Sequence, residues 1–148
     1  MNDERESAAG ADGGGDVDTF EERGVSPAAI ELDEVYRALA HPRRRYLCYT
    51  LQENAEWSLD ELATKIAAWE HGVAIPDVPE NAREQVYVDL YHAHVPKLRE
   101  LGVVEFDEST ETIEAAETAT QVLRALEGMG ASLDSSQETH AREVGDGV

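Results

Sequence analysis

Apolar residues recur at the three- and four-residue spacing of an α-helix chiefly in the middle of this 148-residue chain, between about residues 31 and 133. Residues 1–30 contain five glycines and eight acidic residues, and residues 134–148 are similarly polar. Neither end can bury enough apolar surface to offset the entropy lost on ordering. We therefore predict one folded domain over residues 31–133, with a disordered acidic tail at 1–30 and another at 134–148.

Four helices are predicted in the first part of this domain, because their apolar residues fall on one face. They cover approximately residues 32–39, 42–52, 59–71 and 81–101. Pro42 suits the first turn of the second helix, and Ser58 with Glu61 has the spacing of a capping box before the third. Pro96 is expected to kink or split the fourth helix, which ends at Gly102.

A small β-hairpin and a last helix are predicted after these four helices. Residues 103–107 alternate between apolar and polar, and residues 112–115 can return as the second strand. Thr118 then caps a helix whose apolar stripe is Val122, Leu123, Leu126 and Met129, with Leu133 as an extension. The fold class predicted from this order is mainly α with a small β-hairpin. Cys48 lies inside an apolar pattern and is interpreted as a small core residue.

The charge balance constrains the environment in which this chain can fold. The chain has 32 acidic and 12 basic residues, a formal net charge of -20, and only two of the basic residues are lysines. Such an excess is typical of a cytoplasm with molar potassium salt, which screens charge repulsion within about 3 Å. The alternative is an acidic protein that binds a basic partner at ordinary salt. The sequence has no secretion signal and no membrane-spanning run, which predicts a cytoplasmic protein.

Two local motifs resemble those of a known family. Residues 38–47, ALAHPRRRYL, resemble the opening of ArsR-like winged-helix repressors, and residues 91–104, YHAHVPKLRELGVV, resemble the stretch where their recognition helix enters the wing. The chain as a whole is similar to an uncharacterised family of haloarchaeal winged helix-turn-helix proteins. The resemblance implies a winged helix-turn-helix fold and, by analogy alone, DNA binding. The long loop at 72–80 and the absence of a metal-sensing cysteine pair depart from the ArsR pattern.

DNA recognition by such a fold would place the fourth helix in the major groove of double-stranded DNA. The candidate DNA-contacting residues on this helix are Arg83, Tyr87, His92, Lys97 and Arg99, and those in the only basic cluster are Arg43 and Arg44. The cluster, which also includes Arg45, has a structural alternative, in which its members bind Asp33, Glu34 or helix-end carbonyls. The hairpin carries five acidic residues and no basic one, which argues against contact with phosphate.

Other chemistry finds little support in the sequence. His92 and His94 are about 200° apart on a helix, so they cannot bind one metal ion unless Pro96 distorts the backbone. No nucleophile and base, carboxylate pair or phosphate-binding loop has a spacing that suggests catalysis. We therefore expect neither an enzyme nor a cofactor or metal site.

The leading functional hypothesis is a DNA-binding transcriptional regulator of a halophilic archaeon. We expect it to act as a homodimer joined through the apolar stripes of the first and last helices. The alternative is a protein–protein interaction module that keeps the winged-helix scaffold and does not bind DNA. A basic strip on the folded surface would favour the first hypothesis, whereas a uniformly acidic surface with an apolar groove would favour the second.

Overall fold

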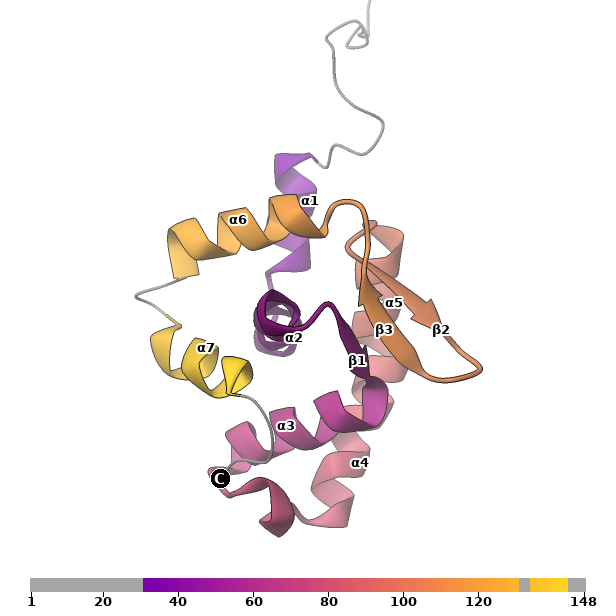
Figure 1. Ribbon diagram of the computed structural model, residues 1–148, viewed down its shortest axis with the longest axis vertical. Coiled ribbons are helices and arrows are strands. Elements are labelled where there is room, and N and C mark those ends of the chain that lie inside the picture. Colours follow the sequence, from indigo (N-terminus) through magenta and orange to yellow (C-terminus); the bar gives the residue numbers. More distant parts are fainter. Residues whose placement is uncertain (1–30, 131–133, 144–148) are drawn as a thin grey trace, which may run out of the picture.

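The computed structural model describes residues 31–130 and 134–143, which are mainly helical with one small antiparallel sheet (Figure 1). The elements in chain order are α1 (Leu32–Ala38), α2 (Pro42–Glu53), β1 (Glu56–Ser58), α3 (Leu59–His71), the 3-10 turn η1 (Ile75–Asp77), α4 (Glu80–Asp89), the π-helical turn η2 (Leu90–His94), α5 (Val95–Glu100), β2 (Val104–Asp107), β3 (Thr112–Ala115), α6 (Ala119–Gly130) and α7 (Ser135–Arg142). The predicted class, mainly α with a small β element, is confirmed. The predicted tail at 1–30, Leu133 and residues 144–148 lie outside the described residues. Among the described helices, none combines the length and the apolar character of a membrane span.

Helix α2 lies at the centre of the fold, with α1, α3, α6, α7 and the sheet around it (Figure 1). Four consecutive side chains, Tyr46, Leu47, Cys48 and Tyr49, are at most 1% exposed, as expected of a helix covered on all sides. Burial raises the pKa of Cys48 to about 12, so its thiol stays protonated. Its predicted role as a small core residue is confirmed.

Helix α3 begins and ends at the residues that the sequence indicates. Ser58 Oγ accepts a hydrogen bond from the backbone N–H of Glu61 at 3.0 Å, and the Glu61 carboxylate accepts one from the N–H of Ser58 at 3.2 Å. This is the predicted capping box. Gly72 ends the helix in the left-handed conformation, with φ of 66°, which a residue without a Cβ adopts at little cost.

The predicted fourth helix is a long rod made of α4, η2 and α5, interrupted where Pro96 requires it. The backbone stays helical from Asp89 through Val95, but residues Leu90–His94 form a π-helical turn. Proline lacks an N–H, and its ring clashes with the carbonyl four residues earlier, so a regular α-helix cannot pass through this position undisturbed. The predicted interruption is confirmed, and its form is a widened turn directly before Val95.

The sheet has three strands in the order β1-β3-β2, so the predicted hairpin β2–β3 gains a third strand. Trp57 of β1 lies opposite Ile113 of β3, which in turn lies opposite Phe106 of β2. The indole Nε1–H of Trp57 donates to the backbone oxygens at the end of α2, at 3.0 Å from Thr50 and 2.7 Å from Asn54. The strand β1 was not predicted, because three residues are too short for an alternating pattern.

The prediction of a disordered tail from residue 134 is wrong for residues 134–143, which include α7. This helix packs on α2 through one fully buried alanine, Ala141, and otherwise through polar contacts. Asp134 accepts from Arg45 Nε at 2.8 Å and from the Tyr49 hydroxyl at 3.1 Å, and Gln137 Nε2 donates to the Pro42 carbonyl at 2.8 Å. Hydrophobic spacing cannot detect a helix that is held in this way.

The apolar stripes that suggested a dimer are used inside the chain. Val35, Leu39, Val122 and Leu126 are all less than 9% exposed and belong to one core. The argument that these side chains are in excess of what the core needs is therefore wrong for all four. The side chain of Met129 is not among those described. On α1, the exposed apolar side chains are instead Leu32 and Tyr36, at 64% and 55%.

Candidate nucleic-acid interface

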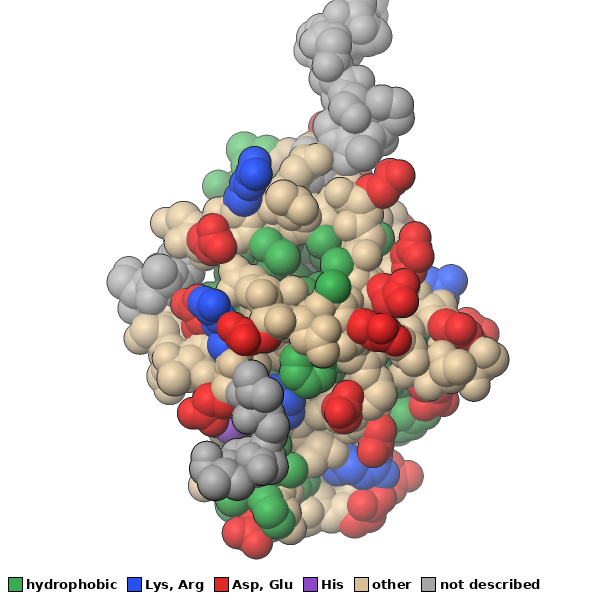
Figure 2. Space-filling model, viewed as in Figure 1, with side chains coloured by type: hydrophobic (Ala, Val, Ile, Leu, Met, Phe, Trp, Pro, Cys, Tyr) green, Lys and Arg blue, Asp and Glu red, His purple; other side chains and the backbone are tan. Residues whose placement is uncertain are grey.

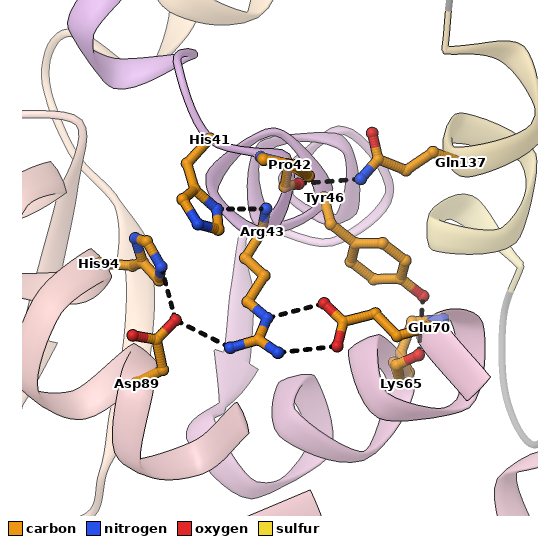
Figure 3. A network of polar contacts seen from close by, with 9 residues as sticks. All are labelled: His41, Pro42, Arg43, Tyr46, Lys65, Glu70, Asp89, His94 and Gln137. Atoms are coloured by element: carbon orange, nitrogen blue, oxygen red, sulfur yellow. Dashed lines mark hydrogen bonds and ion pairs between the residues drawn. The ribbon is translucent and has the colours of Figure 1, made fainter. Parts of the chain in front are cut away.

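Arg43, a predicted DNA contact, points into the protein and joins three helices (Figure 3). Its Nε and Nη2 atoms donate to the two carboxylate oxygens of Glu70 on α3, at 2.7 and 2.8 Å, and its Nη1 donates to Asp89 Oδ2 on α4 at 2.9 Å. The paired hydrogen bond with Glu70, followed by the bond with Asp89, raises the pKa of Arg43. The guanidinium is thus neutralised by two carboxylates of its own chain.

Arg44 and Arg45 bind the carbonyl groups at the end of α1, as the structural interpretation of the basic cluster predicts. Arg44 donates to the carbonyls of Arg37 and Ala38 at 2.8 and 3.0 Å. Arg45 donates to the Leu39 carbonyl at 2.8 Å. Helix-end carbonyls lack intrahelical partners, so these bonds fix α1 on α2. The acidic partners of the cluster are Glu70, Asp89 and Asp134, in place of the predicted Asp33 and Glu34.

Two histidine rings meet next to this cluster, between the start of α2 and the π-helical turn. His94 is 4% exposed, its ring centroid lies 4.2 Å from that of His41, and its Nε2 lies 2.7 Å from Asp89 Oδ2. Its Nδ1 lies 3.1 Å from Arg44 Nη1. A guanidinium can only donate, so Nδ1 accepts, and the proton of neutral His94 is on Nε2, facing Asp89. His92, in contrast, is exposed.

Both histidines favour the neutral form. Burial lowers the pKa of His94, and the positive charge of Arg44 lowers it further, against the opposing effect of Asp89. Burial and Arg44 likewise lower the pKa of His41, whose Nδ1 accepts the backbone N–H of Arg43 at 3.1 Å. A histidine with a lowered folded pKa stabilises the fold fully above its unfolded pKa of about 6.5 and loses that contribution as pH falls below it.

We therefore expect the free energy of unfolding to decrease by on the order of 1–2 kcal/mol between about pH 7.5 and pH 5, at constant molar KCl. Denaturant titrations at each pH measure this change. Replacing His94 by Gln should remove part of the pH dependence, because the side chain no longer titrates. His71→Gln is the matched control, since His71 is exposed at the end of α3. Equal pH profiles for His94→Gln and the unaltered protein would contradict the assignment.

The predicted contacts on α4 lie along its flank, where other side chains of the chain bind them. Arg83 Nη1 donates to Asp60 Oδ1 of α3 at 2.7 Å, and the same guanidinium binds Glu80. The Tyr87 hydroxyl donates to the Glu111 carboxylate beside the hairpin, at 2.7 and 2.8 Å. Arg83 and Tyr87 therefore connect α4 to its neighbours.

The remaining candidates lie toward the end of the rod. His92 is exposed, Lys97 Nζ lies 3.3 Å from the Glu100 carboxylate, and Arg99 Nη1 lies 3.6 Å from Glu108. Single ion pairs at the surface contribute little to stability, so both cations can exchange their partner for another anion. The structure thus separates the seven predicted residues into an inner pair (Arg43 and Arg44), a flanking pair (Arg83 and Tyr87) and an outer group of three.

The outward face of α4 carries four side chains that were not among the predicted contacts. Asn81, Glu84, Gln85 and Val88 are exposed and line a shallow hollow of the surface. Val88 is 48% exposed and also lines the neighbouring hollow, which includes His92. Their spacing of three and four residues, opposite the buried Ala82 and Val86, was visible in the sequence. We name this set the outer stripe of α4.

The outer face of the sheet is acidic. Glu56, Glu114 and Glu105 lie side by side across the three strands, and with Asp107 they line a hollow. Figure 2 shows acidic side chains gathered on the side where Figure 1 places the sheet. Like charges directly opposite on neighbouring strands are destabilising, and this face repels phosphate. Any nucleic acid at the outer stripe must therefore avoid this face or be bound at high salt.

The fold and these surfaces define a small, mainly helical domain in which a long interrupted helix lies next to a three-stranded sheet. Residues 36–114 match the family described as a domain of unknown function (DUF7344). The match covers more than half of the chain, from α1 to β3, and the chain belongs to this family. The comparisons with curated proteins and with solved structures gave no significant match.

Proposed function

We propose that the protein is a DNA-binding transcriptional regulator of the winged helix-turn-helix type, working in the cytoplasm of a halophilic archaeon. The element order supports this proposal, since three helices and the rod precede the hairpin β2–β3, and β1 pairs with the hairpin. The single observation that carries it is the outer stripe of α4. Exposed amide and apolar side chains on one helical face are suited to the edges of bases in the major groove.

In the proposed complex, α4 lies in the major groove and the end of the rod approaches the phosphates. Lys97 and Arg99, whose partners are exposed glutamates, are the cations available there. Molar salt shortens the range of charge repulsion to about 3 Å. Counterion release then contributes little to affinity, so binding rests on shape and direct contacts. The acidic sheet face tolerates a nearby duplex only under these conditions.

A homodimer belongs to the same proposal, since two half-sites on a duplex require two recognition helices. The exposed Leu32 and Tyr36 of α1 are the described apolar side chains that support this contact. They replace the buried stripes as the proposed dimer surface. The side chains of α1 that face inward, Val35 and Ala38, are left to the core.

Replacing His92 or Lys97 by Ala is expected to weaken specific DNA binding about 5- to 100-fold at molar KCl, as for the loss of one good contact. The melting temperature should change little, because neither side chain is buried. Binding is measured on genomic fragments captured at about 2 M KCl, a concentration that screens surface repulsion. Thr120→Ala, on the exposed side of α6, is the control. Unchanged binding by both variants would remove this end of the rod from the interface.

A second candidate function is a protein–protein interaction module, and the acidic sheet face favours it. Most described arginines bind carboxylates or carbonyls of the chain itself, and the hairpin has no cation. A partner with a basic surface would complement this face. The genomic capture separates the two candidates, because an intact fold that enriches no fragment supports the module.

A further inference from the structure

The outer stripe of α4 differs chemically from the residues that most often recognise guanine. Asn81 and Gln85 are one helical turn apart, Glu84 lies beside them, and Val88 follows on the next turn. All four are exposed and line the same hollow. At 1.5 Å per residue, Asn81 and Val88 are about 10 Å apart along the axis, which corresponds to about three stacked base pairs. We infer that the outer stripe selects adenine–thymine pairs in the major groove, an inference that rests on the proposed function.

The two amides provide the attraction. An Asn or Gln side chain has one donor and one acceptor, which match the N7 acceptor and N6 amino group of adenine. Val88 is one of three large apolar side chains that are exposed among the described residues, at 48%. On a helix in the major groove, it supplies the apolar contact that the thymine methyl group requires. Exposed Val88 therefore has a specific partner in an adenine–thymine pair.

Glu84 and Arg83 together disfavour guanine. Guanine presents two acceptors, N7 and O6, and it is usually bound by two donors of an arginine. Glu84 has only acceptors when it is ionised, so it repels that edge. The neighbouring Arg83 cannot replace it, because Asp60 and Glu80 bind its guanidinium. Selectivity thus combines an attractive contact to adenine with a repulsive one to guanine.

Selection of duplexes from a randomised library by the full-length protein, at about 2 M KCl to screen repulsion, tests this inference. We expect enrichment of a core of adenine–thymine pairs. Gln85→Ala and Asn81→Ala should each reduce the preference at one position about 5- to 100-fold. Glu84→Gln should gain tolerance of guanine, because the repulsive charge is removed. Thr120→Ala on α6 is the control and should select the same core.

Circular dichroism of each variant in the selection buffer verifies that the fold is intact. An enriched core that contains guanine, or one that Asn81→Ala and Gln85→Ala leave unchanged, would overturn the inference and leave DNA binding in place. If a folded protein enriches no duplex at all, the proposed function fails, and the inference fails with it. The two failures are therefore distinguished by whether any sequence is enriched.

Discussion

Replacing Leu126 by Glu is expected to unfold the protein, whereas the same replacement at Leu32 is expected to leave it folded. Leu126 is fully buried between α6 and the rest of the core, and Leu32 is 64% exposed. Shortening a buried leucine to alanine typically costs about 2–5 kcal/mol. A buried carboxylate without a partner adds a desolvation penalty, and the total approaches the whole stability of a small domain. The sequence had suggested that Leu126→Glu would produce folded monomers.

Circular dichroism and thermal melting of the two variants measure this difference. Light scattering of the folded Leu32→Glu variant then tests the proposed dimer, because a charge in the α1 contact should shift the protein to monomers. Tyr36→Ala, at the neighbouring exposed position, should weaken the same contact without adding a charge. A folded Leu126→Glu protein would show that α6 does not belong to the core. An unaltered protein that is monomeric at micromolar concentration would overturn the dimer.

Raising KCl from about 0.1 to 2 M is expected to convert a weakly helical protein into a fully helical, cooperatively melting one, because the screening length falls from about 10 Å to below 3 Å. The chain carries a formal net charge of -20. Part of this repulsion is local, since Glu114 lies between Glu56 and Glu105 on neighbouring strands. Each opposed pair costs on the order of 0.2–1 kcal/mol.

The sheet provides a direct test of this local contribution. Glu114→Gln should raise the free energy of unfolding at low salt by about 0.5–2 kcal/mol, because it removes two opposed pairs at once. Glu127→Gln removes the same charge from an exposed position on α6 and is the matched control. The two variants should converge at high salt. Full helicity and an equal melting midpoint at low salt for the unaltered protein would contradict the argument from charge.

The sequence was sufficient for the elements that are marked by backbone chemistry. Pro42 at the start of α2, the Ser58 and Glu61 capping box of α3, and Gly72 at its end all act within a few residues of themselves. Their effect does not depend on the rest of the fold, so local spacing predicts it. The interruption before Pro96 is predictable for the same reason, although its π-helical form is not.

The missing parts of the fold depend on contacts between distant residues. Helix α7 is held by Arg45, Tyr46 and Tyr49, which lie some ninety positions earlier in the chain. Its own residues are too polar to show an apolar face. The same distance applies to the candidate site, where Arg43 finds Glu70 and Asp89 on two other helices. Charge alone ranked Arg43 and Arg83 as DNA contacts, whereas the exposed amides of the outer stripe needed only helical spacing to be found.

The π-helical turn at Leu90–His94 has an implication for how relatives of this chain can differ from it. Such a turn holds one residue more than the α-helical turn in the same place. Deleting one residue within it would restore a regular helix and rotate everything that follows by about 100°. Lys97 and Arg99 would then face another direction relative to Asn81 and Gln85. A single-residue insertion or deletion at this point can therefore change the relative orientation of two binding surfaces while both helices keep their sequences.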